Sequence, residues 1–240
     1  MTNPTAAMLV IGDEILSGRT RDSNMHYLAG ELTRHGIPLA EVRVVADVQG
    51  AIVAAVNALR ATHDHLFTSG GIGPTHDDIT ADAIAAAFGV AIGYRADAMA
   101  LLAAHYDRSG LPFNDARQRM ARIPEGARLI ENPVSTAPGF SLGNVHVMAG
   151  VPNIFQSMVA SVLPTLTGGA PLLSQSLRVN RGEGEVAGPF GALAADYPDL
   201  SMGSYPFMMN GAHGTNLVIR GTDGGRIGEA MTRLATMFPQ

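Results

Sequence analysis

Short apolar runs alternate with amphipathic segments along the first two thirds of the chain. Residues 6–11 form a continuous apolar run that ends at Gly12, a pattern typical of a strand buried on both faces of a parallel sheet. Capping side chains at 22–24 precede apolar residues at helical spacing, and Gly36 ends that helix. Strands and helices that alternate with short connections predict an α/β fold with a mostly parallel sheet. We expect strands at 6–11, 37–46 and 65–68, helices at 25–36, 49–61, 77–88, 96–109 and 115–122, a strand or hairpin arm at 141–149, and a helix that starts at 150–152.

The composition changes at residues 166–171, where Gly and Pro interrupt the apolar pattern, and we expect a linker there. The order expected beyond it is strand, helix, two strands and helix, which is a small α+β unit. These elements are expected at 172–179, 185–196, 202–208, 216–220 and 226–237. The sequence therefore predicts a main domain of residues 1–167 and a small C-terminal α+β subdomain of residues 168–240.

The composition of the 240 residues excludes several kinds of chemistry. There is no Cys, so disulfides, thiolate metal sites and Cys nucleophiles are excluded, and there is no Lys, which excludes Schiff bases and Lys-dependent phosphate loops. Sixteen Arg against 21 acidic residues give a net charge of −5, which argues against a nucleic-acid partner. No stretch reaches the ~18 apolar residues of a membrane span, and the first apolar run follows no basic residue. We expect a soluble, cytoplasmic protein with no membrane partner.

The most informative segment is 69–80, at the end of the third expected strand. Ligands of open α/β sheets bind at such strand ends. Gly70, Gly71 and Gly73 leave backbone N–H groups that can approach an anion, and the following helix adds the positive end of its dipole. The segment matches neither the Rossmann glycine pattern nor a Lys-containing phosphate loop. A structural strand–turn–helix connection is the alternative interpretation.

The side chains after these glycines suit a phosphate ligand with a cation. Thr75 can donate its hydroxyl to a phosphate, and His76 is a second candidate contact. Asp77 and Asp78 would repel a phosphate unless a hard cation such as Mg²⁺ lay between them. The alternative is that one of the two carboxylates caps the helix.

Two further strand ends carry acidic side chains. Asp13 and Glu14 follow the first strand and could bind a metal or a ribose hydroxyl, and Asn24 could bond a heterocycle. Asp47 ends the second strand, where a helix cap is the alternative role. Carboxylates at three strand ends would converge on one cleft of a parallel sheet, which suits metal-assisted phosphoryl or nucleotidyl chemistry.

Other segments are open to both structural and functional interpretations. Residues 132–140 form a stiff loop, with two prolines and a glycine, that could close over a ligand or merely precede a hairpin. Gly150 and Pro152 lie at a helix start, which is either an anion site or a favourable place for proline. His63 and His65 could form a metal pair, but we favour a surface pair, because no third ligand follows at a clear spacing.

Taken together, these segments resemble the CinA family. The resemblance rests on the motifs at 12–18, 22–24, 70–80 and 132–140, and it covers residues 6–166 and, more weakly, the C-terminal unit. The first part is similar to the MoaB/Mog-type molybdopterin-binding domain and to the N-terminal, FAD-hydrolysing part of eukaryotic FAD synthases. Ser23 stands where Thr is more usual in the family.

The resemblance implies a three-layer α/β/α fold with a pocket for a nucleotide or a pterin at the strand ends. It also implies Asp47, Asp77 and Asp78 as catalytic residues, with Asp47 and Asp78 holding a divalent cation such as Mg²⁺, Mn²⁺ or Co²⁺. The ligand-binding positions are then Gly12, Asp13, Glu14, Asn24, Ser69, Gly70, Gly71, Gly73, Pro74, Thr75, His76, Thr80, Thr136, Pro138, Gly139, Gly150 and Pro152. By analogy with relatives we expect a homo-oligomer.

Three functions remain open at this stage. The first is metal-dependent cleavage of ADP-ribose or FAD at the pyrophosphate, the second is molybdopterin binding or adenylylation, and the third is a non-catalytic nucleotide-binding module. The chain is too short for the C-terminal amidohydrolase of many CinA proteins, and it lacks the nucleotidyltransferase half of a FAD synthase, so neither activity is expected.

Overall fold

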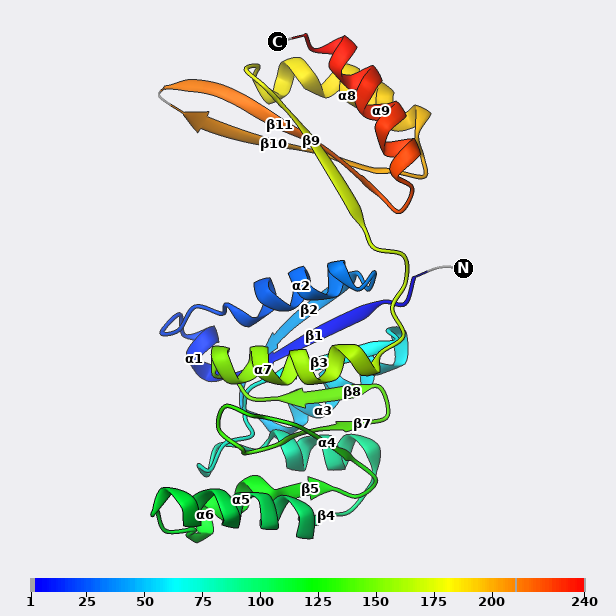
Figure 1. Cartoon of the computed structure of the whole chain (residues 1–240). Coiled ribbons are helices and arrows are strands. Elements are labelled where there is room, and N and C mark those ends of the chain that lie inside the picture. The colour runs from blue at the N-terminus through cyan, green and yellow to red at the C-terminus, as the bar shows by residue number, and fades with distance from the viewer. Residues whose placement is uncertain (1–2, 210, 240) are drawn as a thin grey trace. The chain divides into compact units, whose positions relative to one another are not determined.

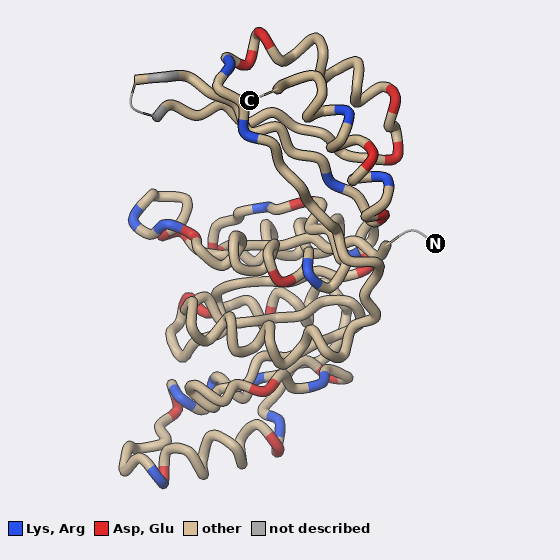
Figure 2. The backbone as a smooth tube through the Cα atoms, turned by 45° about the horizontal axis from the view of Figure 1, so that its top comes forward, with Lys and Arg blue, Asp and Glu red and all other residues tan. Residues whose placement is uncertain are grey.

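The computed structural model describes residues 3–209 and 211–239, and contacts divide the chain into two compact units at Gly169 and Ala170 (Figure 1). The sequence placed the boundary after residue 167. No helix in the described part of the chain is long and apolar enough to cross a membrane. Figure 2 shows residues of both charge signs scattered over each unit.

The first unit is built on a six-stranded, mostly parallel sheet. Its strands lie in the order β2-β1-β3-β8-β7-β6, with β2, β1, β3 and β8 parallel and the last two antiparallel. Their bounds are β1 (Ala6–Ile11), β2 (Leu39–Val45), β3 (His65–Ser69), β8 (Val145–Met148), β7 (Gly139–Leu142) and β6 (Arg128–Ile130). A separate ribbon pairs β4 (Ile92–Tyr94) with β5 (Arg122–Pro124).

Helices cover both faces of the sheet, as Figure 1 shows, which confirms the three-layer prediction. Ala7, Leu9 and Ile11 of β1 pack into one core, and the alternate residues of the same strand pack into the other. All six residues of β1 are buried, so the strand has no polar face. The helices are α2 (Asn24–Arg34) and α7 (Pro152–Val162), continued by η2 (Leu163–Thr165), on one face, and α3 (Gln49–Thr62), α4 (Thr80–Phe88) and α5 (Ala96–Ser109) on the other.

Three local expectations differ from the structure. Helix α4 begins at Thr80 and not at 77, because the Asp78 carboxylate accepts hydrogen bonds from Thr75 and closes a turn before the helix. The loop after β1 contains the short helix α1 (Asp13–Leu16). The helix expected at 115–122 is two short pieces, α6 (Asp115–Gln118) and η1 (Arg119–Ala121), because Arg122 already pairs in β5.

The second unit is the small α+β unit that the sequence predicted. An antiparallel sheet in the order β10-β11-β9 packs its apolar residues against two helices around a core that includes Leu217, Ile219 and Val186. Its elements are β9 (Leu173–Val179), α8 (Glu183–Asp196), β10 (Ser201–Met209), β11 (Ala212–Gly221) and α9 (Gly224–Met237). Asp223 caps α9, because its Oδ1 accepts from the backbone N–H groups of Gly225 and Arg226.

Gly70 has a backbone that only glycine can adopt in this packing, so its replacement tests how tightly β1 and β3 approach at their ends. Its φ is +110°, and a Cβ there would lie 2.1 Å from the carbonyl oxygen of Ile11. Gly18 also has a positive φ, +72°, but a Cβ there would meet nothing within 4 Å. We expect Gly70→Ala to lower the free energy of unfolding by at least about 2 kcal/mol and Gly18→Ala by about 1 kcal/mol. Urea unfolding followed by circular dichroism measures both, and equal losses would contradict the close approach.

Candidate functional site

A cavity of about 520 Å³ opens at the carboxyl ends of β1, β3 and β8. This is the edge at which ligands bind in open α/β sheets, and the volume suits a small molecule. Loops after all three strands, the loop before β7, and residues of η1 and α7 supply its walls. The lining residues are Glu14, Thr20, Gly70, Gly71, Ile72, Gly73, Pro74, Asp78, Met120, Asn132, Ser135, Ala137, Pro138, Ala149, Gly150, Val151, Pro152, Ile154 and Met158.

The glycine loop after β3 is fixed by its own backbone. The N–H of Gly70 donates to the carbonyl of Met148 at 3.1 Å, so it is not free for an anion, contrary to the expectation from sequence. The N–H and hydroxyl of Thr80 donate to the carbonyls of Gly71 and Gly70, at 2.9 and 3.0 Å. Within the described residues, the N–H groups of Gly71 and Gly73 have no protein acceptor. These two amides are therefore among the donors available to a ligand.

Asp78 lies on the cavity wall and shapes the loop. Its Oδ2 accepts from the backbone N–H of Thr75 at 2.8 Å and from the Thr75 hydroxyl at 2.6 Å. The Thr75 hydroxyl therefore donates to Asp78 in this structure and not to a ligand. A Cβ on Gly73 would lie 2.7 Å from the same Asp78 oxygen, so a larger residue there would displace the Asp78 carboxylate.

Asp47 belongs to a second group of acidic residues beside the loop. Its Oδ2 accepts from the backbone N–H of Asp13 at 2.9 Å, so it holds the loop after β1 and does not cap α3. Burial raises the pKa of Asp47; the Asp13 N–H opposes this, and the negative charges of Asp13, Glu14 and Asp77 add to it. No ion pair of Asp13, Glu14 or Asp47 occurs within the described residues.

Asp47 and Asp78 do not belong to a group of protein side chains that could hold a metal ion without further ligands, within the described residues. In the part of the chain that the structure describes, no three His, Cys, Asp or Glu side chains form a group that could hold a metal ion. The residues that raise the pKa of Asp47 do not include Asp78. A cation at this edge would therefore need ligand oxygens as well as carboxylates.

Asn24, at the start of α2, joins two of the strand ends. It is only 3% exposed, and its Nδ2 donates to the Ser69 hydroxyl at 2.8 Å and to the Gly150 carbonyl at 2.7 Å. A carbonyl can only accept, so this bond fixes which way the amide points. The opposite oxygen, Oδ1, has no partner within the described residues, and Asn24 lines a second cavity of about 60 Å³ that shares Glu14, Thr20, Gly150 and Pro152 with the large one.

The loop before β7 is held by Asn132. Its side chain accepts from the N–H groups of Val134 and Ser135 and donates to the Ser135 hydroxyl and the Ala137 carbonyl. Thr136 has a φ of +67°, unusual for a β-branched residue, and its hydroxyl lies 3.0 Å from Nδ1 of His105. These bonds hold Pro138 in the cavity wall.

The structure sorts the predicted site residues into two groups. Those that line one of the two cavities are Glu14, Asn24, Ser69, Gly70, Gly71, Gly73, Pro74, Asp78, Pro138, Gly150 and Pro152. Those that line neither are Gly12, Asp13, Asp47, Thr75, His76, Asp77, Thr80, Thr136 and Gly139. Thr80 is fully buried beneath the loop, the side chain of His76 is fully exposed, and Gly139 is closed in by the carbonyl of Val147.

Sequence reasoning missed the apolar wall of the cavity. Met120 and Met158 lie on η1 and α7, and nothing in their local pattern separates them from ordinary core residues. Thr20 also lines the cavity, and its position two residues after the motif at 12–18 could have marked it as a candidate.

The structure thus defines an α/β protein with a glycine loop and a cavity at its strand ends, and comparison with known proteins shows its family. Residues 7–168 match the family described as probable molybdopterin binding domain, and residues 171–240 match the middle domain of FAD synthase. The solved structure of CinA from Thermoplasma acidophilum is 32% identical, with a TM-score of 0.63, and the match covers 69% of this chain and 99% of that one.

Curated relatives agree. A protein from Archaeoglobus fulgidus is 31% identical over 83% of this chain and 84% of its own length. A CinA-like protein from Desulforapulum autotrophicum is 38% identical over 65% of this chain, which corresponds to 38% of that longer protein. The chain belongs to the CinA family, with a MoaB/Mog-like molybdopterin-binding domain at its N-terminal side.

The environment of Asp47 gives a testable pH dependence. A raised pKa means that the folded chain holds this proton more tightly than the unfolded chain, so Asp47 lowers the free energy of unfolding as the pH rises through the range just above 3.8. Asp47→Asn keeps an oxygen for the Asp13 N–H but carries no charge, so this contribution should vanish. Chemical denaturation from pH 3 to 7 measures it.

Direct titration supplies the control for this prediction. In ¹³C NMR of the side-chain carboxyls, Glu14→Gln should bring the pKa of Asp47 down, because one of the charges that raise it is removed. Glu31→Gln, on α2 where Glu31 pairs with Arg34 and does not act on Asp47, should leave it unchanged. An Asp47 pKa at or below its ordinary value would contradict the proposed environment.

Proposed function

We propose that this protein is a metal-dependent nucleotide pyrophosphatase that cleaves ADP-ribose or FAD. The observation that carries the proposal is that amide donors, carboxylates and a cavity lie together at one edge of the sheet. Free amides of Gly71 and Gly73 and the Asp78 carboxylate border a cavity sized for a small molecule, beside acidic residues without cationic partners. Hydrolysis would join a water oxygen to one phosphorus while the bridging oxygen leaves with the other phosphate, giving two monoesters.

The residues present fit a divalent cation. Negative charge from Asp13, Glu14 and Asp77 raises the pKa of Asp47, and a bound cation would relieve that repulsion. Mg²⁺ in particular is usually held by one or two carboxylates together with substrate phosphates, so a protein-only ligand set is not required. Asp47 and Asp78 would hold the ion, which when bound would neutralise phosphate charge and activate water.

The other groups would bind and orient the ligand. The N–H groups of Gly71 and Gly73 would donate to phosphoryl oxygens, as backbone amides do in anion sites. Apolar side chains at Ile72, Met158 and Pro138 would receive a planar ring, since pockets combine an apolar wall with a few placed polar groups. The match of residues 171–240 to the middle domain of FAD synthase supports a flavin nucleotide among the substrates.

Molybdopterin binding or adenylylation is the second candidate. It is favoured by one observation, the match of residues 7–168 to the probable molybdopterin binding domain. A pterin carrying a phosphate needs the same free amides and the same apolar wall. A third reading, nucleotide binding without turnover, predicts the same affinity and no reaction.

A substrate panel tests the hydrolysis. Purified protein with ADP-ribose or FAD and Mg²⁺, Mn²⁺ or Co²⁺ should release AMP, measured by chromatography. Asp78→Asn keeps an acceptor for Thr75 but removes the charge, and we expect it to lower kcat/KM by about 10²–10³-fold. Asp107→Asn, an exposed position on α5, is the matched control and should be unaffected. No AMP release with any metal would exclude the proposed reaction.

Calorimetry separates the ligand classes. We expect tighter binding of ADP-ribose than of molybdopterin to the wild-type chain. A preference for the pterin, together with ATP-dependent adenylylation, would favour the second candidate. Nucleotide binding with no turnover, unaltered by Asp78→Asn, would favour the non-catalytic module.

A further inference from the structure

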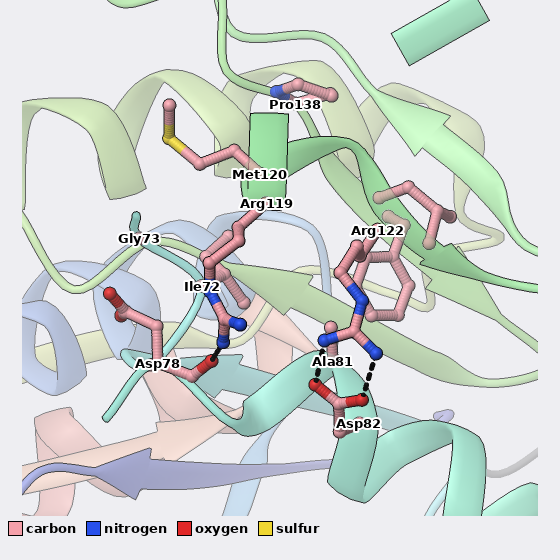
Figure 3. A pocket seen from close by; sticks show the side chains of 12 residues that line it. Ile72, Gly73, Asp78, Ala81, Asp82, Arg119, Met120, Arg122 and Pro138 are labelled. Carbon is pink, nitrogen blue, oxygen red and sulfur yellow. Dashed lines mark hydrogen bonds and ion pairs between the residues drawn. The ribbon is translucent and has the colours of Figure 1, made fainter. Parts of the chain in front are cut away.

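Arg119 lies on the flank of the glycine loop, outside the motifs that the sequence pointed to. It belongs to η1 and lines a small cavity of about 20 Å³ together with Gly71, Gly73 and Asp78. These three loop residues also line the large cavity, so the loop forms a wall of both spaces. Figure 3 shows the Arg119 side chain extending to the segment that carries Asp78.

The guanidinium of Arg119 is poorly satisfied by the protein. Its single hydrogen bond within the described residues runs from Nη2 to the carbonyl oxygen of Asp78, at a long 3.5 Å. Its Nε is buried and has no acceptor there. A guanidinium carries five N–H donors and is always charged, so leaving a buried one unmatched is unfavourable. The arrangement therefore lacks an acceptor, and an anion is the acceptor that would suit it best.

The guanidinium of the nearby Arg122, in contrast, has its hydrogen-bond acceptors. Arg122 donates to both carboxylate oxygens of Asp82, at 3.0 and 2.7 Å, and Figure 3 shows the two parallel bonds. The Asp78 carboxylate makes no such pair with Arg119, and its Oδ2 accepts from Thr75 instead. In the described part of the chain no carboxylate lies within ion-pair distance of Arg119.

We propose that Arg119 binds a phosphoryl group of the ligand held on the glycine loop. The inference rests on the proposed function in that the ligand is a phosphate ester or diphosphate. A space of about 20 Å³ admits one group the size of a water or a phosphoryl oxygen. An oxygen placed there lies beside Gly71, Gly73 and the side chain of Arg119, whose Nε has no protein acceptor within the described residues. The planar fork of Arg matches phosphate geometry, and this chain has no Lys to take that part.

This arrangement would place opposite charges on the two sides of the bound phosphates. Arg119 would approach the phosphoryl oxygens from η1, while Asp47 and its acidic neighbours would approach through a cation. Arg119 would then contribute to phosphate affinity even without metal. A purely structural role, in which Arg119 only holds the Asp78 carbonyl, would leave metal-free phosphate affinity unchanged.

The test is calorimetric binding of inorganic pyrophosphate, AMP and adenosine to the full chain in EDTA. Arg119→Met removes the charge and keeps an unbranched apolar side chain, and Arg119→Lys keeps the charge without the fork. Arg108→Met, at an exposed position on α5, changes the net charge equally and is the matched control. We expect Arg119→Met to weaken pyrophosphate at least 10-fold, Arg119→Lys to weaken it less, and neither to change adenosine affinity.

Each outcome bears on one claim. Pyrophosphate affinity in a folded Arg119→Met equal to that of wild type would overturn the proposal, as would a wild-type chain that does not bind pyrophosphate. If Arg119→Met fails to fold, Arg119→Lys decides: a weaker pyrophosphate affinity supports the proposal, and an unchanged affinity overturns it. If Arg119→Met loses pyrophosphate binding and the wild-type protein releases no AMP, the role of Arg119 in phosphate binding is supported and the proposed hydrolysis is excluded. Normal hydrolysis with an unchanged KM in Arg119→Met supports the proposed hydrolysis and contradicts phosphate binding by Arg119.

Discussion

The close approach of three strand ends is the constraint on which the rest of the site depends. A Cβ at Gly70 would overlap the carbonyl oxygen of Ile11, and one at Gly150 would lie 3.3 Å from the Cα of Gly70. The buried amide of Asn24 bonds Ser69 and the Gly150 carbonyl and so closes the same junction from the α2 side. Backbone therefore packs on backbone at this edge, and residues whose amides have no protein acceptor line a cavity.

Charge is distributed unevenly around that junction. The acidic side chains lie after β1 and β2 and in the turn before α4, while Arg119 on η1 contacts the carbonyl of Asp78 and has no carboxylate partner within the described residues. Like charges held together at partly buried positions cost free energy unless a ligand or an ion compensates them. Such uncompensated groups are typical of binding sites, since their cost is recovered when the ligand arrives.

The two units of the chain differ in how much their structures indicate about function. The first combines a packed three-layer fold with a cavity and perturbed charges. The second has its own core around Leu217 and Ile227 and matches a domain of FAD synthase. Its capped helix α9 and its antiparallel sheet are explained by local sequence alone, through Asp223 and the alternation of Leu217 and Ile219.

The layers of the fold and the loops that carry the site follow from the pattern of residues along the chain. Continuous apolar runs, as in 6–11, can be stable only between two helical layers, and glycines after β3 mark a backbone that must approach another closely. Tertiary structure alone decided which groups are free. Gly70 has its N–H bonded to Met148, Thr75 gives its hydroxyl to Asp78, and Arg119 is left without a carboxylate. Such partners are distant in sequence or are selected by the fold of a turn, so no local pattern records them.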